Sequence, residues 1–317
     1  MDELIRKLDT DEWLTSANEL YFYLKDKFQG QKGSIKRVRN IYDDERREKL
    51  LSLRSNFLKN KDISELDQRL NNYTSEIQRI NNLIQTRIYY DLLNTLINKK
   101  DLEEYHPECF KVANFLSNTL ISDTSKLRLN AIITRIITES GGQSNKANAG
   151  IAGEDFTKTI FDVIGLKENI DYKAQHKSKK GSDTDFVFPY VEDFKDLDVD
   201  IFMAVQFSSN DRARLVTSEL KTGAKKYAVT GNGLSASSKN LGDIGVQIIE
   251  DYKNNNIQMV CFGPEIEREK EELKSKITSG SSRVNVSDNI NKLDYIENFM
   301  ITFSELAEKL QSRIKTF

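Results

Sequence analysis

The amino-terminal part of the chain places its apolar side chains at helical spacing and contains no convincing strand. These apolar positions recur three or four residues apart, as in Leu50, Leu51, Leu53 and Phe57 and later in Ile77, Ile80, Leu83, Ile84 and Ile88. Between Asp43 and Lys100 the charge density is high and helix breakers are nearly absent. The pattern predicts a helical domain over residues 1–125, with long antiparallel helices that expose one face to solvent.

From about Lys126 helical and extended segments alternate. Residues 126–139 and 148–164 have helical spacing, and the glycines and small polar residues at 140–145 predict a loop between them. Extended segments rich in Val, Ile and Phe follow at residues 172–176, 185–190, 200–207 and 214–221. A helix at 243–252, a strand at 257–262 and a closing pair of charged helices complete the pattern. The predicted fold class is α/β (α+β), in which residues 126–317 form a mixed central sheet flanked by helices.

Composition and charge exclude several classes of protein. With 317 residues, 47 of them basic and 49 acidic, the chain can bury a proper core, but its net charge of −2 indicates no partner. No apolar run could span a bilayer and no signal peptide opens the sequence, so we expect a cytoplasmic protein without a membrane partner. Cys109 and Cys261 each lie in an apolar stretch, which predicts buried, reduced thiols. With only His106 and His176 available, histidine-based metal or nucleophile chemistry is disfavoured.

A group of acidic and basic residues is predicted to meet on one pair of strands. The sequence Ser-Ser-Asn-Asp is a turn signal between the strand-like runs 200–207 and 212–221, so these runs are expected to form a hairpin. In both registers that fit the turn, Asp200 lies on the face of Glu219 and Lys221, because side chains alternate along a strand. Two carboxylates and an amine would then converge.

This grouping suits phosphodiester hydrolysis. Two carboxylates such as Asp200 and Glu219 can hold a hydrated Mg²⁺, which polarises the scissile phosphate and lowers the pKa of the attacking water. Lys221 would orient that water or stabilise charge on the phosphate oxygens. The alternative is structural, since an exposed Glu-x-Lys sequence is also a common solvated strand pattern.

The Val-Asp-Ile-Phe sequence around Asp200 and the Ser-Glu-Leu-Lys-Thr-Gly sequence around Glu219 and Lys221 resemble the PD-(D/E)xK nucleases. Type II restriction endonucleases are the most similar branch, and the resemblance covers about residues 148–263. It implies a restriction-endonuclease-like core, a magnesium cofactor and double-stranded DNA as substrate. No proline precedes Asp200, which departs from the family pattern.

A second aspartate competes with Asp200 as metal ligand. Asp185, in the sequence Thr-Asp-Phe-Val-Phe-Pro, has the same acid-before-apolar form, and Asp183 shares its face. The hairpin register favours Asp200, but the choice stays open. The resemblance also implies a metal-binding glutamate on the preceding helix, at Glu154, whose alternative is a solvated residue near a helix amino terminus.

Basic residues flank the proposed site and could neutralise phosphates. The predicted DNA-binding residues are Lys177, Lys179, Lys180, Arg212, Arg214, Lys225, Lys226 and Lys239. Their alternative role is simply to keep loops soluble. The resemblance implies a homodimer, to which the helical domain would supply a dimer contact or a wrap around DNA. The competing functions are another nuclease of the same core, for repair, recombination or defence, and a non-enzymatic helical DNA-binding or scaffold protein.

Overall fold

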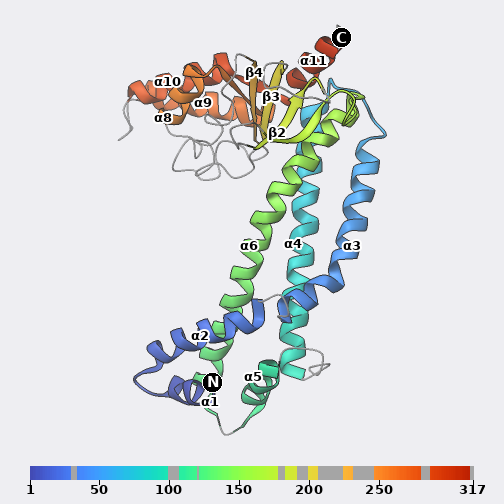
Figure 1. The fold of residues 1–317 in the computed structure, drawn as a ribbon. Coiled ribbons are helices and arrows are strands. Elements are labelled where there is room, and N and C mark those ends of the chain that lie inside the picture. The colour runs from blue at the N-terminus through green and yellow to red at the C-terminus, as the bar shows by residue number, and fades with distance from the viewer. Residues whose placement is uncertain are drawn as a thin grey trace. The chain divides into compact units, whose positions relative to one another are not determined.

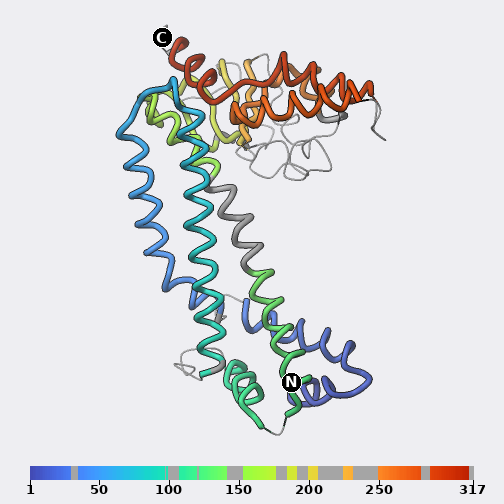
Figure 2. The backbone as a smooth tube through the Cα atoms, turned by 180° about the vertical axis from the view of Figure 1, so that it is seen from behind, coloured from blue at the N-terminus to red at the C-terminus, as the bar shows by residue number. Residues whose placement is uncertain are grey.

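The fold was obtained as a computed structural model, and its backbone is traced in Figure 2. The structure describes residues 1–29, 34–98, 107–119, 121–177, 183–190, 199–205, 224–230, 246–279 and 286–314. These residues combine helices with a six-stranded mixed sheet, as the expected α+β class requires. The chain forms two compact units, Met1–Leu53 with Ser75–Lys146 and Arg54–Thr74 with Ala147–Phe317.

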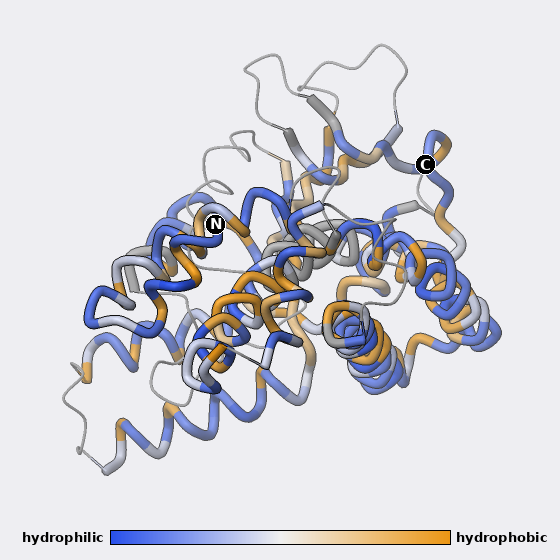
Figure 3. The backbone as a smooth tube through the Cα atoms, turned by 90° about the horizontal axis from the view of Figure 1, so that it is seen from below, coloured by the Kyte–Doolittle hydropathy of each residue, from blue (hydrophilic) through white to orange (hydrophobic). Residues whose placement is uncertain are grey.

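Every element described before residue 120 is a helix, as the apolar spacing predicts (Figure 1). These elements are α1 (Asp2–Arg6), the 3-10 helix η1 (Lys7–Asp9), α2 (Trp13–Gln29), α3 (Ser34–Phe57), α4 (Leu66–Asn98) and α5 (Pro107–Ser117). Figure 3 shows hydrophobic and hydrophilic positions alternating around the helices. No helix within the described ranges is long and apolar enough to cross a membrane.

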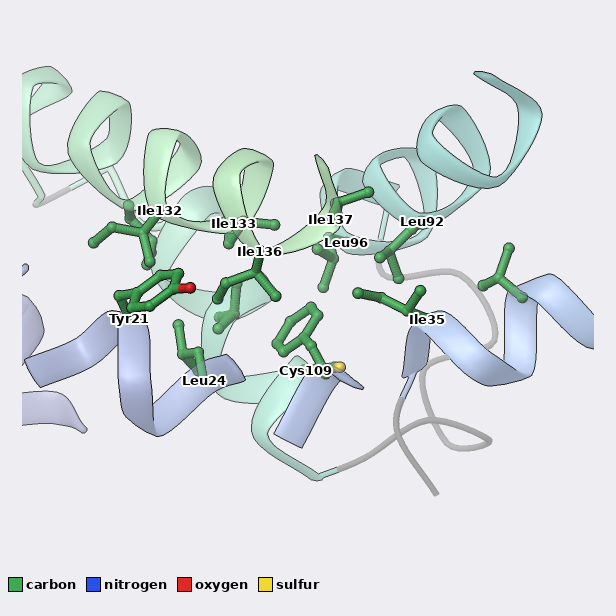
Figure 4. Close-up of a cluster of buried hydrophobic side chains, with 14 of the residues drawn as sticks. Tyr21, Leu24, Ile35, Leu92, Leu96, Cys109, Ile132, Ile133, Ile136 and Ile137 are labelled. Atoms are coloured by element: carbon green, nitrogen blue, oxygen red, sulfur yellow. The ribbon is translucent and has the colours of Figure 1, made fainter. Parts of the chain in front are cut away.

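The core of the first unit lies where α2, α4 and α6 (Asp123–Val163) meet. Leu24, Leu96 and Ile136 come from these helices and project into one cluster (Figure 4). On α2, Leu20 and Leu24 are one turn apart and both fully buried, which is the helical repeat read from the sequence. Cys109 of α5 is buried in this cluster, as predicted from its apolar sequence context.

The prediction of a loop at residues 140–145 is wrong, because α6 continues from Asp123 to Val163 as one helix of 41 residues. A glycine costs a helix about 1 kcal/mol relative to alanine, so Gly141 and Gly142 favour a break locally. The stretches on either side are each held by a core of their own. Ile133 is buried in the first unit and Phe156 in the second, and the backbone between them remains helical.

The second unit is built on the six-stranded sheet, whose strands follow the chain order. The strands are β1 (Lys173–Lys177), β2 (Asp183–Phe188), β3 (Ile201–Val205), β4 (Lys225–Val229), β5 (Ile257–Cys261) and β6 (Met300–Thr302). The pairs β1·β2 and β2·β3 are antiparallel, and the pairs from β3 to β6 are parallel. The remaining helices are α8 (Val246–Asn254), α9 (Gly263–Ser279), α10 (Val286–Phe299) and α11 (Phe303–Ile314).

Helices cover both faces of this sheet. On one face Phe161 of α6 packs edge-on against Phe186 and Phe188 of β2, with ring centroids 5.1 and 5.3 Å apart. The other face joins Phe202 and Ala204 of β3 to buried residues of α8, α9 and α10 in one core cluster. Burial on both faces explains the nearly continuous apolar sequence of β3 and β5.

The hairpin expected between residues 200–207 and 212–221 is contradicted for Ile201–Val205. Both sides of β3 are already paired, with β2 on one side and β4 on the other. The pairing with β4 is parallel, and residues 206–223 between them have the length that a parallel crossover requires. Sequence reading also missed β4 and β6, whereas the strand expected at 257–262 is confirmed as β5.

The two units divide at other points than the expected domain boundary. Residues 126–146 belong to the first unit although they were expected in the second domain, and Arg54–Thr74 belongs to the second unit. Helices α3, α4 and α6 therefore supply residues to both units. The functional roles assigned to residues 1–125 and 126–317 stay predictions.

Candidate active-site edge of the sheet

The parallel strands define one edge of the sheet, here called the carboxyl edge, at Val205, Val229 and Cys261. Because β2 runs antiparallel to β3, its first residues lie at this same edge. Ligands of open α/β sheets bind beyond the carboxyl ends of parallel strands. The residues that β2 contributes here are Asp183 and Asp185.

Asp185 is the candidate acid that the structure places at the carboxyl edge. It stands one residue beyond the pair Phe186↔Met203, and the backbone N–H of Val205 donates to its Oδ2 at 2.6 Å. The side chain is half-buried. A backbone donor on a neighbouring strand holds the carboxylate in one orientation, because the position of Val205 is itself fixed by pairing with β4.

Glu154 reaches the same edge from α6. The Nε2 of Gln175, in β1, donates to Oε2 of Glu154 at 3.1 Å. Gln175 lies opposite Asp185, because both fall between the cross-strand pairs Ala174↔Phe186 and His176↔Thr184. Glu154 thus contacts the residue that lies opposite Asp185, although strand alternation points Asp185 to the face of the sheet that α6 does not cover.

Asp200 lies at the opposite edge, here called the amino edge. Its backbone N–H donates to the carbonyl of Phe188, and its carbonyl accepts from the N–H of Lys225, each at 2.9 Å. Asp200 precedes Ile201, whereas Asp185 lies level with Ala204, so about 13 Å of strand separates the two along the sheet. They cannot bind one metal ion, and the register argument that favoured Asp200 no longer holds.

Several predicted site residues lie outside the described residues: Glu219, Lys221, Lys179, Lys180, Arg212, Arg214 and Lys239. Val205, the last described residue before Glu219, lies at the carboxyl edge, and Ala224, the first after Lys221, precedes β4. Lys177 ends β1 at the carboxyl edge, opposite Asp183. Lys225 is exposed at the start of β4.

Lys226 was predicted to contact DNA, but the structure buries its side chain. Its side chain is 7% exposed, and its Nζ donates to the carbonyl of Asn255 at 3.2 Å. Burial lowers the pKa of this amine. Side chains alternate along β4, so Lys226 points inward while the neighbouring Lys225 points to solvent. The Lys226 amine lies at the carboxyl-terminal end of α8, where a positive charge is favourable.

The carboxyl edge offers part of a metal site. Among the residues that the structure describes, no three acids, histidines or cysteines are grouped so that they could hold a metal ion. Asp185 and Glu154 are hard oxygen ligands of the kind Mg²⁺ prefers, and Mg²⁺ commonly takes only one or two carboxylates and keeps several waters. Asp185 and Glu154 therefore have the ligand chemistry that Mg²⁺ prefers, but strand alternation points Asp185 to the face of the sheet opposite α6.

Sequence reading missed Gln175, for which no local pattern gives a signal, and the buried acid Glu269. Glu269 was detectable, because Ile266, Glu269 and Leu273 share one face of α9 at helical spacing. Glu269 is 2% exposed, and its Oε1 has no hydrogen-bond partner among the described residues. It lies in the second unit but is not part of the proposed active site.

Burial raises the pKa of Glu269 to about 8, with nearby charges adding smaller effects. The folded protein then keeps a proton that the unfolded chain loses near pH 4.5. The contribution of this proton to the free energy of unfolding should be fully present below that pH. As the pH rises toward 8, the free energy of unfolding should fall by at most about 1.4 kcal/mol per pH unit. Urea unfolding of Glu269→Gln should show a much flatter profile between pH 5 and 8. Glu271→Gln, at an exposed position of the same helix, is the control, and equal slopes in all three proteins would contradict the prediction.

Comparisons of this chain with protein families, with curated proteins and with solved structures found no match. Functional inference for the chain therefore rests on its own residues and on the geometry of the carboxyl edge.

Proposed function

We propose that the protein is a Mg²⁺-dependent endonuclease of the PD-(D/E)xK type that cleaves double-stranded DNA at a specific sequence, as type II restriction endonucleases do. The observation that carries the proposal is Asp185, whose carboxylate accepts from the Val205 N–H at the carboxyl edge, where ligands of open α/β sheets bind. The element order supports it as well. The helix α6 followed by the antiparallel strands β1 to β3 has the order of the first part of the core that the sequence resemblance implies, a helix and then three antiparallel strands.

In this proposal Asp185, Glu154 and Glu219 supply the oxygen ligands. A bound Mg²⁺ polarises the scissile phosphate and lowers the pKa of the attacking water. Water then adds to phosphorus while one P–O bond of the DNA backbone breaks. Lys221 orients that water or stabilises the charge that builds on the phosphate oxygens.

Basic residues near the sheet would hold the duplex. Lys177 and Lys225 remain candidates for phosphate contacts, together with the lysines and arginines outside the described residues. Double-strand cleavage at a twofold-symmetric site fits a homodimer, for which the helical first unit would supply the contact between subunits or a wrap around DNA. The proposed location of the protein is the cytoplasm.

Plasmid cleavage tests the proposal. The purified full chain with Mg²⁺ should convert plasmid DNA into discrete fragments, and EDTA should stop the reaction. Lys221→Ala should reduce the rate by about 100-fold or more, because it removes charge stabilisation in the transition state. Lys274→Ala, which changes an exposed lysine of α9, should cleave like the wild type.

The outcomes separate the competing functions. Nicks, smears or cleavage restricted to branched DNA would indicate a repair, recombination or defence nuclease with the same core. DNA binding without cleavage in any divalent metal would leave only the non-enzymatic binding protein. Cleavage that Lys221→Ala does not affect would show that the lysine assignment is wrong.

A further inference from the structure

Two arginines of α3, Arg39 and Arg46, are each held by a neutral group instead of an acid. Nη2 of Arg39 donates to the Ser140 hydroxyl of α6 at 3.2 Å, and Nε of Arg46 donates to Oδ1 of Asn81 in α4 at 2.9 Å. Among the residues that the structure describes, neither guanidinium forms an ion pair. Both arginines are half-buried, and they and their partners all belong to the first unit. Their positive charges are therefore fixed in place but not neutralised.

Arg39 is the less well compensated of the two. Its Nε is buried and has no hydrogen-bond partner within the described ranges, and burial lowers the pKa of its guanidinium. Asp43, one turn further along α3, favours the charge of Arg39 from a distance, whereas Arg46 opposes it. Partial burial of a charge without a bound counter-ion is unfavourable. Arg39 would therefore gain from the approach of an anion.

A third cation lies on the same face of α3. Lys36, Arg39, Asp43 and Arg46 follow one another at intervals of three or four residues, so their side chains share one side of the helix. Lys36 is exposed and forms no ion pair with another described residue. Lys36, Arg39 and Arg46 are here called the α3 basic face. Its two arginines are about 10 Å apart along the helix, so they can contact two different anionic groups.

The adjoining part of α6 adds to the excess of positive charge. Lys25 of α2 and Arg135 of α6 both contact the carboxylate of Glu139, the residue before Ser140, each at 2.9 Å. Two cations there share one acid, and the Arg135 side chain remains 61% exposed. This excess occurs in a chain whose net charge is −2, so it reflects the local arrangement and not the overall composition.

The chemistry of the α3 basic face fits a phosphate backbone. A guanidinium presents its N–H groups as a planar fork that matches phosphate oxygens, and nucleic acid offers such groups at regular spacing. The neutral oxygens of Ser140 and Asn81 orient the two guanidinium groups without cancelling their charge. A carboxylate in either place would compete with the phosphate.

We propose that the α3 basic face binds the phosphate backbone of double-stranded DNA and does not read its sequence. The inference takes its partner from the proposed function, and of the two roles left to the first unit it assigns the holding of DNA. Binding at this face requires no metal ion and none of the proposed catalytic residues.

Binding of short DNA duplexes to the full chain in EDTA tests the inference without cleavage. The logarithm of the affinity should fall linearly with the logarithm of the salt concentration. Arg39→Gln and Arg46→Gln should each make this slope shallower by about 1, because each removes about one phosphate contact. The change should be equal for two duplexes of unrelated sequence. Arg79→Gln is the matched control, since Arg79 of the same unit already pairs with Glu76, and its slope should equal that of the wild type.

Melting temperatures separate this role from a structural one. Arg39→Gln removes a half-buried charge that has no acid partner, so the variant should melt at the wild-type temperature or above it. If Arg39→Gln does not fold, Arg46→Gln and Arg39→Lys carry the test. The first should still make the slope shallower by about 1, and the second should keep the wild-type slope because it keeps the charge.

Wild-type slopes in both glutamine variants would overturn this inference, and plasmid cleavage by the wild type would leave the proposed function standing. Shallower slopes in a chain that cleaves no DNA with any divalent metal would support the α3 basic face and remove the nuclease. Dissociation of a dimer in both variants, measured by light scattering, would show that the face joins subunits and overturn the inference. Tighter binding of polyglutamate than of DNA would assign the face to an acidic protein partner instead.

Discussion

Replacing Asp185 with asparagine should abolish Mg²⁺-dependent DNA cleavage, whereas the same change at Asp200 should leave it close to the wild-type rate. Asparagine keeps the shape of the side chain and an oxygen that can accept from the Val205 N–H, so the fold is preserved. What is lost is the negative charge that would hold the metal ion. We expect a loss of about 1,000-fold in the cleavage rate, equivalent to about 4 kcal/mol of transition-state stabilisation.

The expected contrast follows from the direction of the strands. Asp185 lies at the carboxyl edge, near Gln175 and Glu154, while Asp200 lies at the amino edge with its backbone bonded to Phe188 and Lys225. Asp200 is also exposed, so its replacement removes no buried contact. The measurement is the single-turnover rate of plasmid cleavage by each variant. Equal melting temperatures of the variants and the wild type show that the fold is unchanged.

The reverse outcome is equally informative. If Asp200→Asn abolishes cleavage and Asp185→Asn retains it, the metal site lies at the amino edge. If neither change matters in an active enzyme, the catalytic acids belong to segments other than β2 and β3.

Replacing Asp67 with alanine should destabilise the second unit by about 3 kcal/mol. Asp67 lies in the first turn of α4, and its carboxylate accepts from the backbone N–H groups of Gly263, Phe303 and Ser304, at 3.3, 3.1 and 2.9 Å, and from the Ser304 hydroxyl. These groups begin α9 and α11, and the first N–H groups of a helix have no partner within it. Loss of one capping side chain typically costs about 1 kcal/mol, and here one carboxylate serves two helices.

Urea unfolding followed by circular dichroism checks this prediction, with the transition of the second unit analysed separately if the two units unfold in turn. Asp67→Asn keeps an acceptor oxygen and should show a smaller loss than Asp67→Ala. Asp11→Ala, at an exposed position before α2, should change stability by less than about 0.5 kcal/mol. A loss for Asp67→Ala no larger than for Asp11→Ala would rule out the capping role.

The features predicted correctly from the sequence are those that depend on nearby residues. Ile80, Ile84 and Ile88 repeat with the helix period and are buried on one face of α4. The apolar run at 257–262 forms a buried strand, and Cys109 and Cys261 are buried thiols. Local sequence patterns identified three candidate acids, Asp185, Glu154 and Asp200. Those patterns could not predict how far apart the three side chains lie.

Tertiary structure alone decided that the two candidate aspartates lie at opposite edges of the sheet. Asp185 and Asp200 each occur near the start of a strand, but β2 and β3 are antiparallel, so the two starts lie at opposite edges of the sheet. The turn signal after Phe207 reports only local preference, and it could not reveal that both sides of β3 are already paired. Likewise, the glycines within α6 favoured a loop. The structure has one continuous helix there, with buried residues before and after the glycines.

The sequence by itself thus determined the helices, the apolar strands and the set of acids from which an active site could be built. The tertiary structure decided the strand directions, and with them the position of Asp185 at the carboxyl edge and of Asp200 at the amino edge. The physical reason is that helical periodicity and burial arise from contacts within a few residues of each other. Strand pairing joins segments distant in the chain, and its register depends on which partner competes successfully for each side of a strand.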